Sequence, residues 1–278
     1  MQLAIGKMLA AIGARKLVAR SARYLSNAAR LDCENSIAAN GESDIQCKIA
    51  ELIEGASQRV ILDIGANRGE WTQSFLDKCA LQGRRDFTVH AFEPVSGTID
   101  IMKDNLQQAI QAGRVVPVNA GMSDECRQSV IYLVGAVAGT NALQADPTMK
   151  DLPSQVVDLW TIDSYCEENS IDHLLYAKVD VEGHDLQVLK GAANMLRRGA
   201  IDCLQFEYNH RWIWSRAFLR DAFEIANMSG YVIGKVTPVG VEVYKQWHPE
   251  LEKFVEGNYV IYKQTNPLRF REIAWWNH

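Results

Sequence analysis

Several common functional signals are missing from this sequence. No two of its six cysteines form a Cys-x-x-Cys pair, which argues against a zinc site and favours reduced, buried cysteines in a cytoplasmic protein. The net charge of −5 argues against nucleic acid as the main partner. No internal repeat or low-complexity tract stands out, and 47% of the residues are apolar, so we expect a folded domain with a sizeable core.

The basic residues are unevenly distributed along the chain. Residues 1–31 carry six of the 29 basic residues and none of the 34 acidic ones, so the remainder has a net charge of −11. The large apolar residues of this segment are spaced broadly like one face of a helix: Leu3, Leu9, Ile12, Leu17 and Leu25. We therefore expect a basic amphipathic N-terminal helix.

This N-terminal segment is too short to span a bilayer, and Arg15 and Lys16 interrupt the apolar stretch that a signal peptide needs. Two interpretations stay open. The helix packs on the domain with its basic residues in solvent, or it makes peripheral contact with an anionic membrane, at the inner face.

The rest of the chain alternates between short apolar runs and helical patterns. The apolar runs predict seven strands, at 60–64, 87–92, 114–119, 174–179, 201–206, 231–236 and 258–263. The helical patterns lie at 70–80, 97–112, 184–198 and 215–228. This alternation predicts a doubly wound α/β sheet in a domain spanning 32–264, followed by a tail at 265–278.

Two features interrupt this alternation. The run at 129–135 predicts an extra strand. Residues 135–153 then predict a loop of unusual length, and loops of this length in compact domains are often functional. We expect a substrate-binding cap there.

The stretch VILDIGANRGEW predicts a strand that ends in a glycine loop and opens a helix. Ligands of open α/β sheets bind beyond the carboxyl ends of the strands, which is where this loop lies. Gly65 and Gly69 form the pattern G-x-x-x-G, and the dinucleotide fingerprint G-x-G-x-x-G and the phosphate loop are both absent. Asp63 would repel a pyrophosphate but could pair with an ammonium group, while Gly65, Ala66, Asn67 and Gly69 line the approach. A plain tight turn is the alternative.

Polar residues also follow the next two predicted strands. Glu93, in HAFEP, could accept both hydroxyls of a ribose. Ser123 and Asp124 lie in NAGMSD, where Asp124 could reach an adenine edge. Together with Asp63, these groups match the amino acid and adenosine parts of S-adenosylmethionine, which we expect as the cofactor.

The most unusual stretch is LLYAKVDVEGHD. Lys178, Asp180 and Glu182 alternate at period two, so we expect all three to point to one side, toward the crevice. Charges on a buried strand are costly unless they pair or serve a site. The alternative is a structural Lys–Asp pair with Glu182 at a helix start.

Methyl transfer to an alcohol needs alignment of the reacting atoms and a base for the hydroxyl proton. Asp180 is the best-placed base, with Lys178 holding it ionised. His210, in QFEYNH, is a second candidate, although a surface or core histidine is an equal interpretation. A magnesium-type ion could be bound by Asp180, Glu182, Glu207 and His210. Their spacing does not demand one, so we expect no metal.

Two tryptophans follow His210. Trp212 and Trp214, in RWIW, could stack on a sugar or aromatic acceptor, or could pack in the protein.

With these residues in place, the sequence resembles the FkbM family of S-adenosylmethionine-dependent methyltransferases. The similar pieces are ILDIGANRGEWT, AFEP, the Glu207 strand and DLWTIDSYCEENSIDHLLYAKVDVEGHDLQVLKGA, within 58–263. The most specific of these similar pieces is the pattern Lys-x-Asp-x-Glu-Gly followed by Leu-Lys-Gly. One departure is Asp185, where the family usually has glutamate, and we assign it no role.

The resemblance implies a class I methyltransferase fold, which is Rossmann-like with a seven-stranded sheet whose last strand is antiparallel. It also implies O-methylation of a hydroxyl, typically on sugars of polysaccharides, lipopolysaccharides or glycolipids, or on natural products. By position, it implies that the cofactor is held by Asp63, Gly65, Asn67, Gly69, Glu93 and Asp124. It places Lys178, Asp180 and Glu182 against the transferred methyl group.

We therefore expect a methyltransferase that acts on a carbohydrate hydroxyl of a small-molecule or glycan acceptor. The alternatives are methylation of a natural-product hydroxyl and a non-catalytic cofactor-binding scaffold, which the charges of LLYAKVDVEGHD disfavour. A nucleic-acid methyltransferase is disfavoured by the acidic domain and by the lack of an Asn/Asp-Pro-Pro-Tyr pattern.

Overall fold

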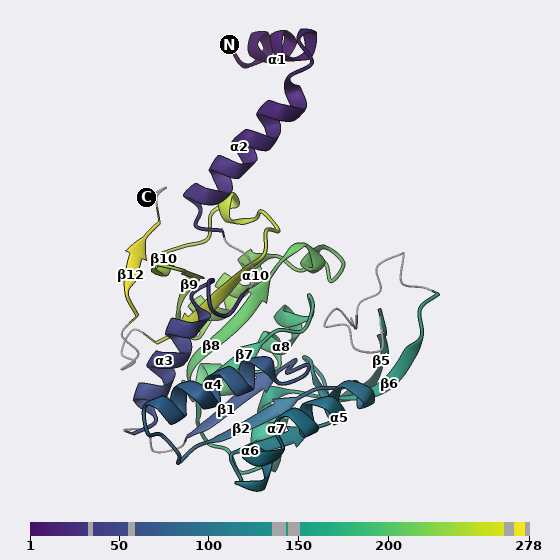
Figure 1. Ribbon diagram of the computed structural model, residues 1–278, viewed down its shortest axis with the longest axis vertical. Coiled ribbons are helices and arrows are strands. Elements are labelled where there is room, and N and C mark those ends of the chain that lie inside the picture. Colours follow the sequence, from purple (N-terminus) through teal and green to yellow (C-terminus); the bar gives the residue numbers. More distant parts are fainter. Residues whose placement is uncertain (33–35, 55–58, 135–142, 144–150, 264–269, 276–278) are drawn as a thin grey trace.

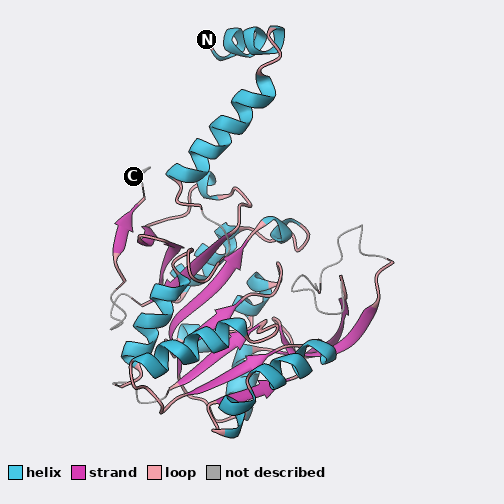
Figure 2. Ribbon diagram, in the orientation of Figure 1, coloured by secondary structure: helices cyan, strands magenta, loops and turns pink. Residues whose placement is uncertain are grey.

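The computed structural model describes residues 1–32, 36–54, 59–134, 143, 151–263 and 270–275 (Figure 1). Most of the predicted loop at 135–153 lies outside the described residues, so the expected cap stays a prediction. The described part forms a twisted sheet with helices on both faces, a second small sheet and a projecting pair of N-terminal helices (Figure 2).

The main sheet has nine strands in the order β12-β10-β9-β11-β8-β7-β1-β2-β3. The bounds are β1 Val60–Ile64, β2 Thr88–Phe92, β3 Val115–Val118, β7 Leu174–Val179, β8 Ile201–Tyr208, β9 Val232–Thr237, β10 Gly240–Tyr244, β11 Gly257–Tyr262 and β12 Glu272–Ala274. Strands β3, β2, β1, β7 and β8 are parallel, and β11 runs antiparallel to both β8 and β9. The seven predicted strands and the antiparallel last one are confirmed, and β10 and β12 extend the sheet at the β9 edge.

The second sheet has three strands, in the order β4-β6-β5. They are β4 Gly121–Met122, β5 Arg127–Tyr132 and β6 Ser154–Trp160. The extra strand predicted at 129–135 corresponds to β5, which pairs antiparallel with β6. This sheet lies beside β3 and follows it in the chain (Figure 1).

The helices of the domain cover both faces of the main sheet. They are α3 Glu42–Leu52, α4 Glu70–Leu81, α5 Ser96–Asn105, α6 Gln107–Gln111, α7 Ile162–Glu168, α8 Asp185–Lys190, α9 Ala193–Arg197 and α10 Leu219–Met228, with 3₁₀ turns η2 His210–Ile213 and η3 Pro249–Leu251. One core lies on the α7–α10 face and a second on the α3–α6 face. The doubly wound architecture is thus confirmed.

Two predicted helices are each divided in the structure. The pattern at 97–112 becomes α5 and α6, which are separated at Leu106, a buried residue with φ −100°. The pattern at 184–198 becomes α8 and α9, divided after Gly191. A Cβ at Gly191 would lie 2.1 Å from the carbonyl oxygen of Ser123, so this position packs against the chain after β4.

The predicted N-terminal helix is two helices, α1 Gln2–Ala11 and α2 Arg15–Ala29. Neither has a buried residue, and both project away from the domain (Figure 1). The interpretation as a helix packed on the domain is therefore wrong for this segment. In the described part of the chain, no helix combines the length and apolar character needed to cross a membrane.

The cysteines largely follow the sequence expectation. Cys79, Cys166 and Cys203 are buried and all five described cysteines are free. Cys126 departs from the expectation, because it is exposed at the start of the small sheet, with its sulfur 2.9 Å from the hydroxyl of Ser164.

Candidate active site

The glycine loop joins β1 to α4 through three residues with positive φ. Gly65 and Gly69 have φ +85°, and Asn67 between them has φ +50°. A Cβ at Gly65 would lie 1.9 Å from the carbonyl oxygen of Asp180, so this glycine lets the ends of β1 and β7 approach each other. A Cβ at Gly69 would meet Leu106 at 2.7 Å, so Gly69 serves the packing of α4 on α5 and α6.

Glu93 is tied to this loop by its own carboxylate. One carboxylate oxygen accepts the backbone N–H of Asn67 at 3.1 Å, and the other accepts the N–H of Val95 at 2.9 Å. The side chain is 7% exposed, and burial raises its pKa to about 7, against the two backbone hydrogen bonds, which lower it. Ala66 is buried, and its N–H bonds to the carbonyl of Phe92, so it fixes the loop against β2.

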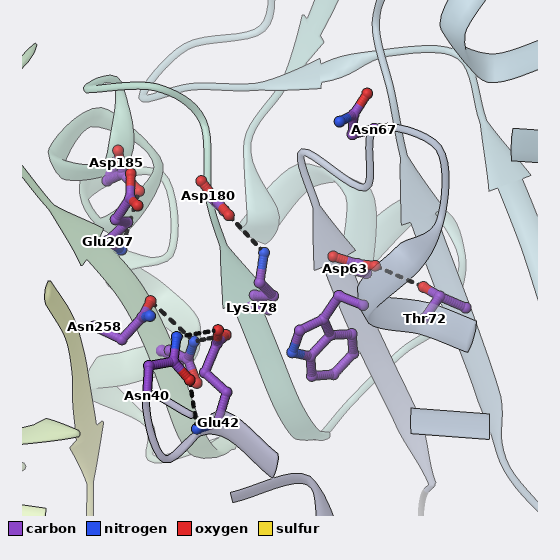
Figure 3. Close-up of polar contacts among 12 residues, drawn as sticks. Asn40, Glu42, Asp63, Asn67, Thr72, Lys178, Asp180, Asp185, Glu207 and Asn258 are labelled. Carbon is purple, nitrogen blue, oxygen red and sulfur yellow. Dashed lines mark hydrogen bonds and ion pairs between the residues drawn. The ribbon is translucent and has the colours of Figure 1, made fainter. Parts of the chain in front are cut away.

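Asp63 is completely buried on β1. One of its oxygens accepts from the hydroxyl of Thr72 at 2.6 Å, and the other has no hydrogen-bond partner among the described residues. Burial raises the pKa of Asp63, and the nearby Lys178 and the Thr72 hydroxyl act against that shift. Figure 3 shows Asp63 and Lys178 on neighbouring strands, where the register pairs them directly.

Lys178 holds Asp180 in a short ion pair. Lys178 Nζ lies 2.8 Å from Asp180 Oδ2, with 7% of the lysine side chain exposed and 32% of the aspartate side chain (Figure 3). Burial alone would lower the pKa of Lys178, but Asp180, Asp63 and Glu42 together raise it above its ordinary value. The lysine is therefore a fixed cation that presents a partly exposed carboxylate at the end of β7.

A buried polar cluster lies beneath Lys178. Gln205, the register partner of Lys178 on β8, donates to Glu42 at 2.5 Å and to Asn258 at 3.1 Å. Asn40 donates to the second oxygen of Glu42 at 2.8 Å (Figure 3). This cluster was not predicted, because it joins the start of α3 to β8 and β11, which lie far away in the sequence.

The alternation expected for Lys178, Asp180 and Glu182 ends with the strand. Strand β7 stops at Val179, and Glu182 lies in the following turn with φ +56°, a conformation rare outside glycine. Its carboxylate pairs with Arg211 at 2.6 Å and is 16% exposed. Burial and then Asp180 raise the pKa of Glu182 to about 7, and Arg211 acts in the opposite direction.

Ser123 and Asp124 lie after β4 beside a buried histidine. The Ser123 hydroxyl is 2.9 Å from both Asp124 Oδ1 and His184 Nε2. His184 is 2% exposed, and burial lowers its pKa to about 4. Sequence reasoning gave His184 no function, and a histidine directly after Glu182-Gly183 is too weak a signal to suggest one.

Other predicted residues have different surroundings. Asp185 is fully buried and accepts the backbone N–H groups of Gly183 and Glu207, so it joins the β7 turn to β8. Glu207 is buried and accepts from Asn209 at 2.5 Å, and burial raises its pKa well above its usual range. His210 is exposed at the start of η2 and is not among the described residues that line the site cavity.

The two tryptophans differ as well. Trp212 is fully buried and donates to the carbonyl of Glu207, so the interpretation as an acceptor platform is wrong for it. Trp214 is 43% exposed and remains a candidate. Among the described residues, no group of three His, Cys, Asp or Glu side chains is arranged to hold a metal ion.

A cavity opens at the carboxyl ends of β1, β2 and β7. Its polar wall is formed by Asn67, Glu93, Asp180 and Glu182. Its apolar wall includes Ile64, Met122, Ile131 and Leu143. Of the described residues that line it, none carries a positive charge.

These walls suit a nucleoside with a positively charged group. Glu93 lines the cavity, and each of its carboxylate oxygens accepts one backbone hydrogen bond, which leaves each with a further lone pair. The apolar wall suits an adenine face. Asp63 is fully buried at the end of β1, with one oxygen that has no hydrogen-bond partner among the described residues. The described residues that line the cavity do not include Asp63, Ser123 or Asp124.

Comparisons with known proteins identify the family of this chain. The model of the "Methyltransferase FkbM domain" matches residues 63–233, which include the loop, Glu93 and the Lys178–Asp180 pair. A hexuronic acid methyltransferase, AglP of Haloferax volcanii, is 30% identical over 160 residues, which cover 56% of this chain and 59% of that relative. The chain thus aligns with little more than half of its relative.

A crystal structure of an FkbM methyltransferase from Methylobacillus flagellatus is 18% identical, with a TM-score of 0.49, and the match covers 74% of this chain and 44% of that one. The family model, by contrast, spans more than half of the chain and includes the residues that line the cavity. The chain therefore belongs to the FkbM methyltransferase family.

Proposed function

We propose that the protein is an S-adenosylmethionine-dependent O-methyltransferase that acts on a hydroxyl of a sugar. The observation that carries this proposal is that two carboxylates line the same cavity. Glu93 lies at the wall next to the glycine loop, and Asp180, held by Lys178, lies at the end of β7. The Glu93 carboxylate is suited to accept hydrogen bonds from a ribose, and the Asp180 carboxylate is suited to accept the proton of a hydroxyl group.

The donor would be held by the loop residues and Glu93. Gly65 and Asn67 would offer backbone surface, and Glu93 would accept the ribose hydroxyls. Asp63, and Asp124 beside Ser123, would act from behind or beside the cavity through charge. When bound, S-adenosylmethionine would supply an electrophilic methyl group whose carbon–sulfur bond breaks as the acceptor oxygen bonds to carbon.

Asp180 would remove the hydroxyl proton of the acceptor. About a third of its side chain is exposed, and its Oδ2 is fixed by Lys178, so the carboxylate is reachable and oriented. Lys178 itself is too buried to touch an acceptor, so it is a positioning residue. Glu182, fixed by Arg211, would orient the acceptor at the same wall.

The charge of the cavity favours a hydroxyl over a carboxylate as the methylated group. The relative AglP is named for hexuronic acid, a sugar that carries both groups. Three carboxylates line this cavity. Lys178 and Arg211, which pair with Asp180 and Glu182, are not among the described residues that line it, so an acidic acceptor would face carboxylates without a cation to bind it. A neutral sugar hydroxyl would avoid repulsion by these carboxylates.

The first test is thermal unfolding with S-adenosylhomocysteine and, as a control, with NAD. A ligand at about 100 times its dissociation constant adds about 2.7 kcal/mol of stability, which for a chain of this size raises Tm by about 5 °C. A rise with S-adenosylhomocysteine alone supports the cofactor assignment, and a rise with NAD alone contradicts it.

The acceptor is then sought with radiolabelled S-adenosylmethionine and a panel of neutral sugars, uronic acids and small aromatic alcohols. Methyl transfer to neutral sugars supports the proposal. Transfer only to uronic carboxylates or only to aromatic alcohols would replace it.

A further inference from the structure

The helices α1 and α2 have no part in the proposed function, yet they expose many large apolar side chains. On α1 and its flanks, Met1, Leu3, Ile5, Met8 and Ile12 are 47% to 100% exposed. On α2, Leu17, Val18, Tyr24 and Leu25 are 42% to 75% exposed. Exposed apolar side chains in this number on one segment mark an interaction site rather than a solvated surface.

The sequence of α2 separates apolar from basic residues around the helix. Lys16, Arg20 and Arg23 recur at spacings of four and three, so they share one face. Leu17 and Tyr24 are seven residues apart and lie on another face, together with Val18 and Leu25, which are also seven apart. The helix therefore carries a basic face beside a broad apolar face.

The arm formed by α1 and α2 is attached to the domain at its base. Asp32 forms an ion pair with the buried Lys235 of β9 and another with Arg30 at 3.1 Å. Arg30 also donates to the carbonyl oxygen of Glu250 at 3.3 Å. These contacts fix the C-terminal end of α2 on the domain, while its exposed faces stay away from the core (Figure 1).

We propose that α1 and α2 bind the surface of an anionic lipid bilayer. The apolar residues enter the boundary between headgroups and acyl chains, and the basic face lies against the anionic headgroups. The choice of partner rests on charge complementarity, because residues 1–29 hold five cations and no acid. A fluid surface also accepts apolar side chains from both helices without a matching pocket.

The test is co-sedimentation of the full chain with vesicles of phosphatidylcholine alone or of phosphatidylcholine with about 30% phosphatidylglycerol. Binding is expected with the anionic vesicles and is expected to weaken as salt is raised, because salt screens the headgroup charge. Equal binding to both vesicle types, or no binding to either, would overturn the proposal.

Two sets of variants separate the contributions of charge and apolar area. The combination of Lys16→Ser, Arg20→Ser and Arg23→Ser should weaken binding on the order of 100-fold, because each cation near such a surface contributes roughly fivefold. Leu17→Ser with Leu25→Ser should also weaken it. All of these side chains are exposed, so Tm with and without S-adenosylhomocysteine should not change.

Matched controls place equal changes elsewhere on the surface. Three exposed cations of the domain are removed by Arg85→Ser, Lys190→Ser and Lys245→Ser. Two apolar side chains, 85% and 86% exposed, are removed by Leu81→Ser with Met228→Ser. These controls should bind vesicles like the parent chain. A control that loses as much binding as the α2 variants would refute the assignment, and so would self-association through α2 without vesicle binding.

Discussion

The close approach at Gly65 yields the sharpest test of how the fold builds the site. In Gly65→Ala the new Cβ would lie 1.9 Å from the carbonyl oxygen of Asp180, whereas a Cβ essentially never lies within 3.0 Å of such an atom. The end of β7 must therefore retreat by about 1 Å. The backbone N–H of Asp180 bonds to the carbonyl of Ile64 at 2.9 Å, so this movement strains the link between β1 and β7.

Gly83→Ala is the matched control. Gly83 has φ +71°, close to the +85° of Gly65, but nothing lies within 4 Å of the position that a Cβ would take there. Both substitutions cost about 1–2 kcal/mol for the left-handed backbone. Only Gly65→Ala adds the clash and the strained hydrogen bond, which brings its total to about 3–4 kcal/mol. At about 2 °C per kcal/mol, the expected losses in Tm are about 3 °C for Gly83→Ala and about 7 °C for Gly65→Ala.

The two variants should differ even more in function. Displacement of Asp180 by about 1 Å should lower turnover on the order of 100-fold, and it should also weaken S-adenosylhomocysteine binding at the loop. Gly83→Ala should keep both parental values. Calorimetric titration and differential scanning calorimetry measure affinity and Tm, and methyl transfer from radiolabelled donor measures turnover. If Gly65→Ala matched Gly83→Ala in Tm, affinity and turnover, the close approach of β1 and β7 would not matter to the site.

Three further predictions concern the charged groups. Asp180→Asn should keep S-adenosylhomocysteine affinity within about threefold but lower turnover at least roughly 100-fold, because the amide cannot take the hydroxyl proton; unchanged turnover would remove Asp180 from the mechanism. The pKa of Glu93 is about 7, and only its ionised form accepts two ribose hydroxyls, so S-adenosylhomocysteine affinity should fall by up to about tenfold per pH unit below about 7. Glu93→Gln should flatten that profile, and a flat parental profile between about pH 5.5 and pH 8, measured by calorimetric titration, would contradict the role of Glu93. Arg211 opposes the rise in the pKa of Glu182, so Arg211→Gln should move that pKa above about 7 and shift the pH–rate profile to higher pH. A profile that stays in place would show that the ionisation of Glu182 does not limit turnover.

Sequence reasoning succeeded where one rule governs the geometry. The carboxyl ends of parallel strands meet at one edge of the sheet, so the residues after β1, β2 and β7 could be placed together before the fold was known. The cavity is lined by Asn67, Glu93 and Asp180. The antiparallel β11 followed instead from the family resemblance, because no local pattern distinguishes its direction.

The same reasoning failed where a local pattern ended or where the partner lies far away in the sequence. Alternation predicts side-chain direction only within a strand, and β7 ends at Val179, so the turn redirects Glu182. Its partner Arg211 lies in the 3₁₀ turn after β8, and no sequence spacing relates the two. Leu106 divides a continuous helical pattern because tertiary packing at Gly69 outweighs helix propensity there.

The buried cation of the site depends on residues outside the family match. Three carboxylates raise the pKa of Lys178, and Glu42, which precedes the matched residues 63–233, is one of them. Each oxygen of Glu42 accepts a hydrogen bond from a buried amide, one from Gln205 and one from Asn40, so this anion is satisfied without reaching Lys178. A buried charge without a compensating opposite charge is costly, which applies to the ammonium group of Lys178. Asp180 is partly exposed, so it compensates that charge less than a buried carboxylate would. Helix α3 therefore belongs to the active-site unit, because it supplies one of the three negative charges that keep Lys178 charged and fixed behind Asp180.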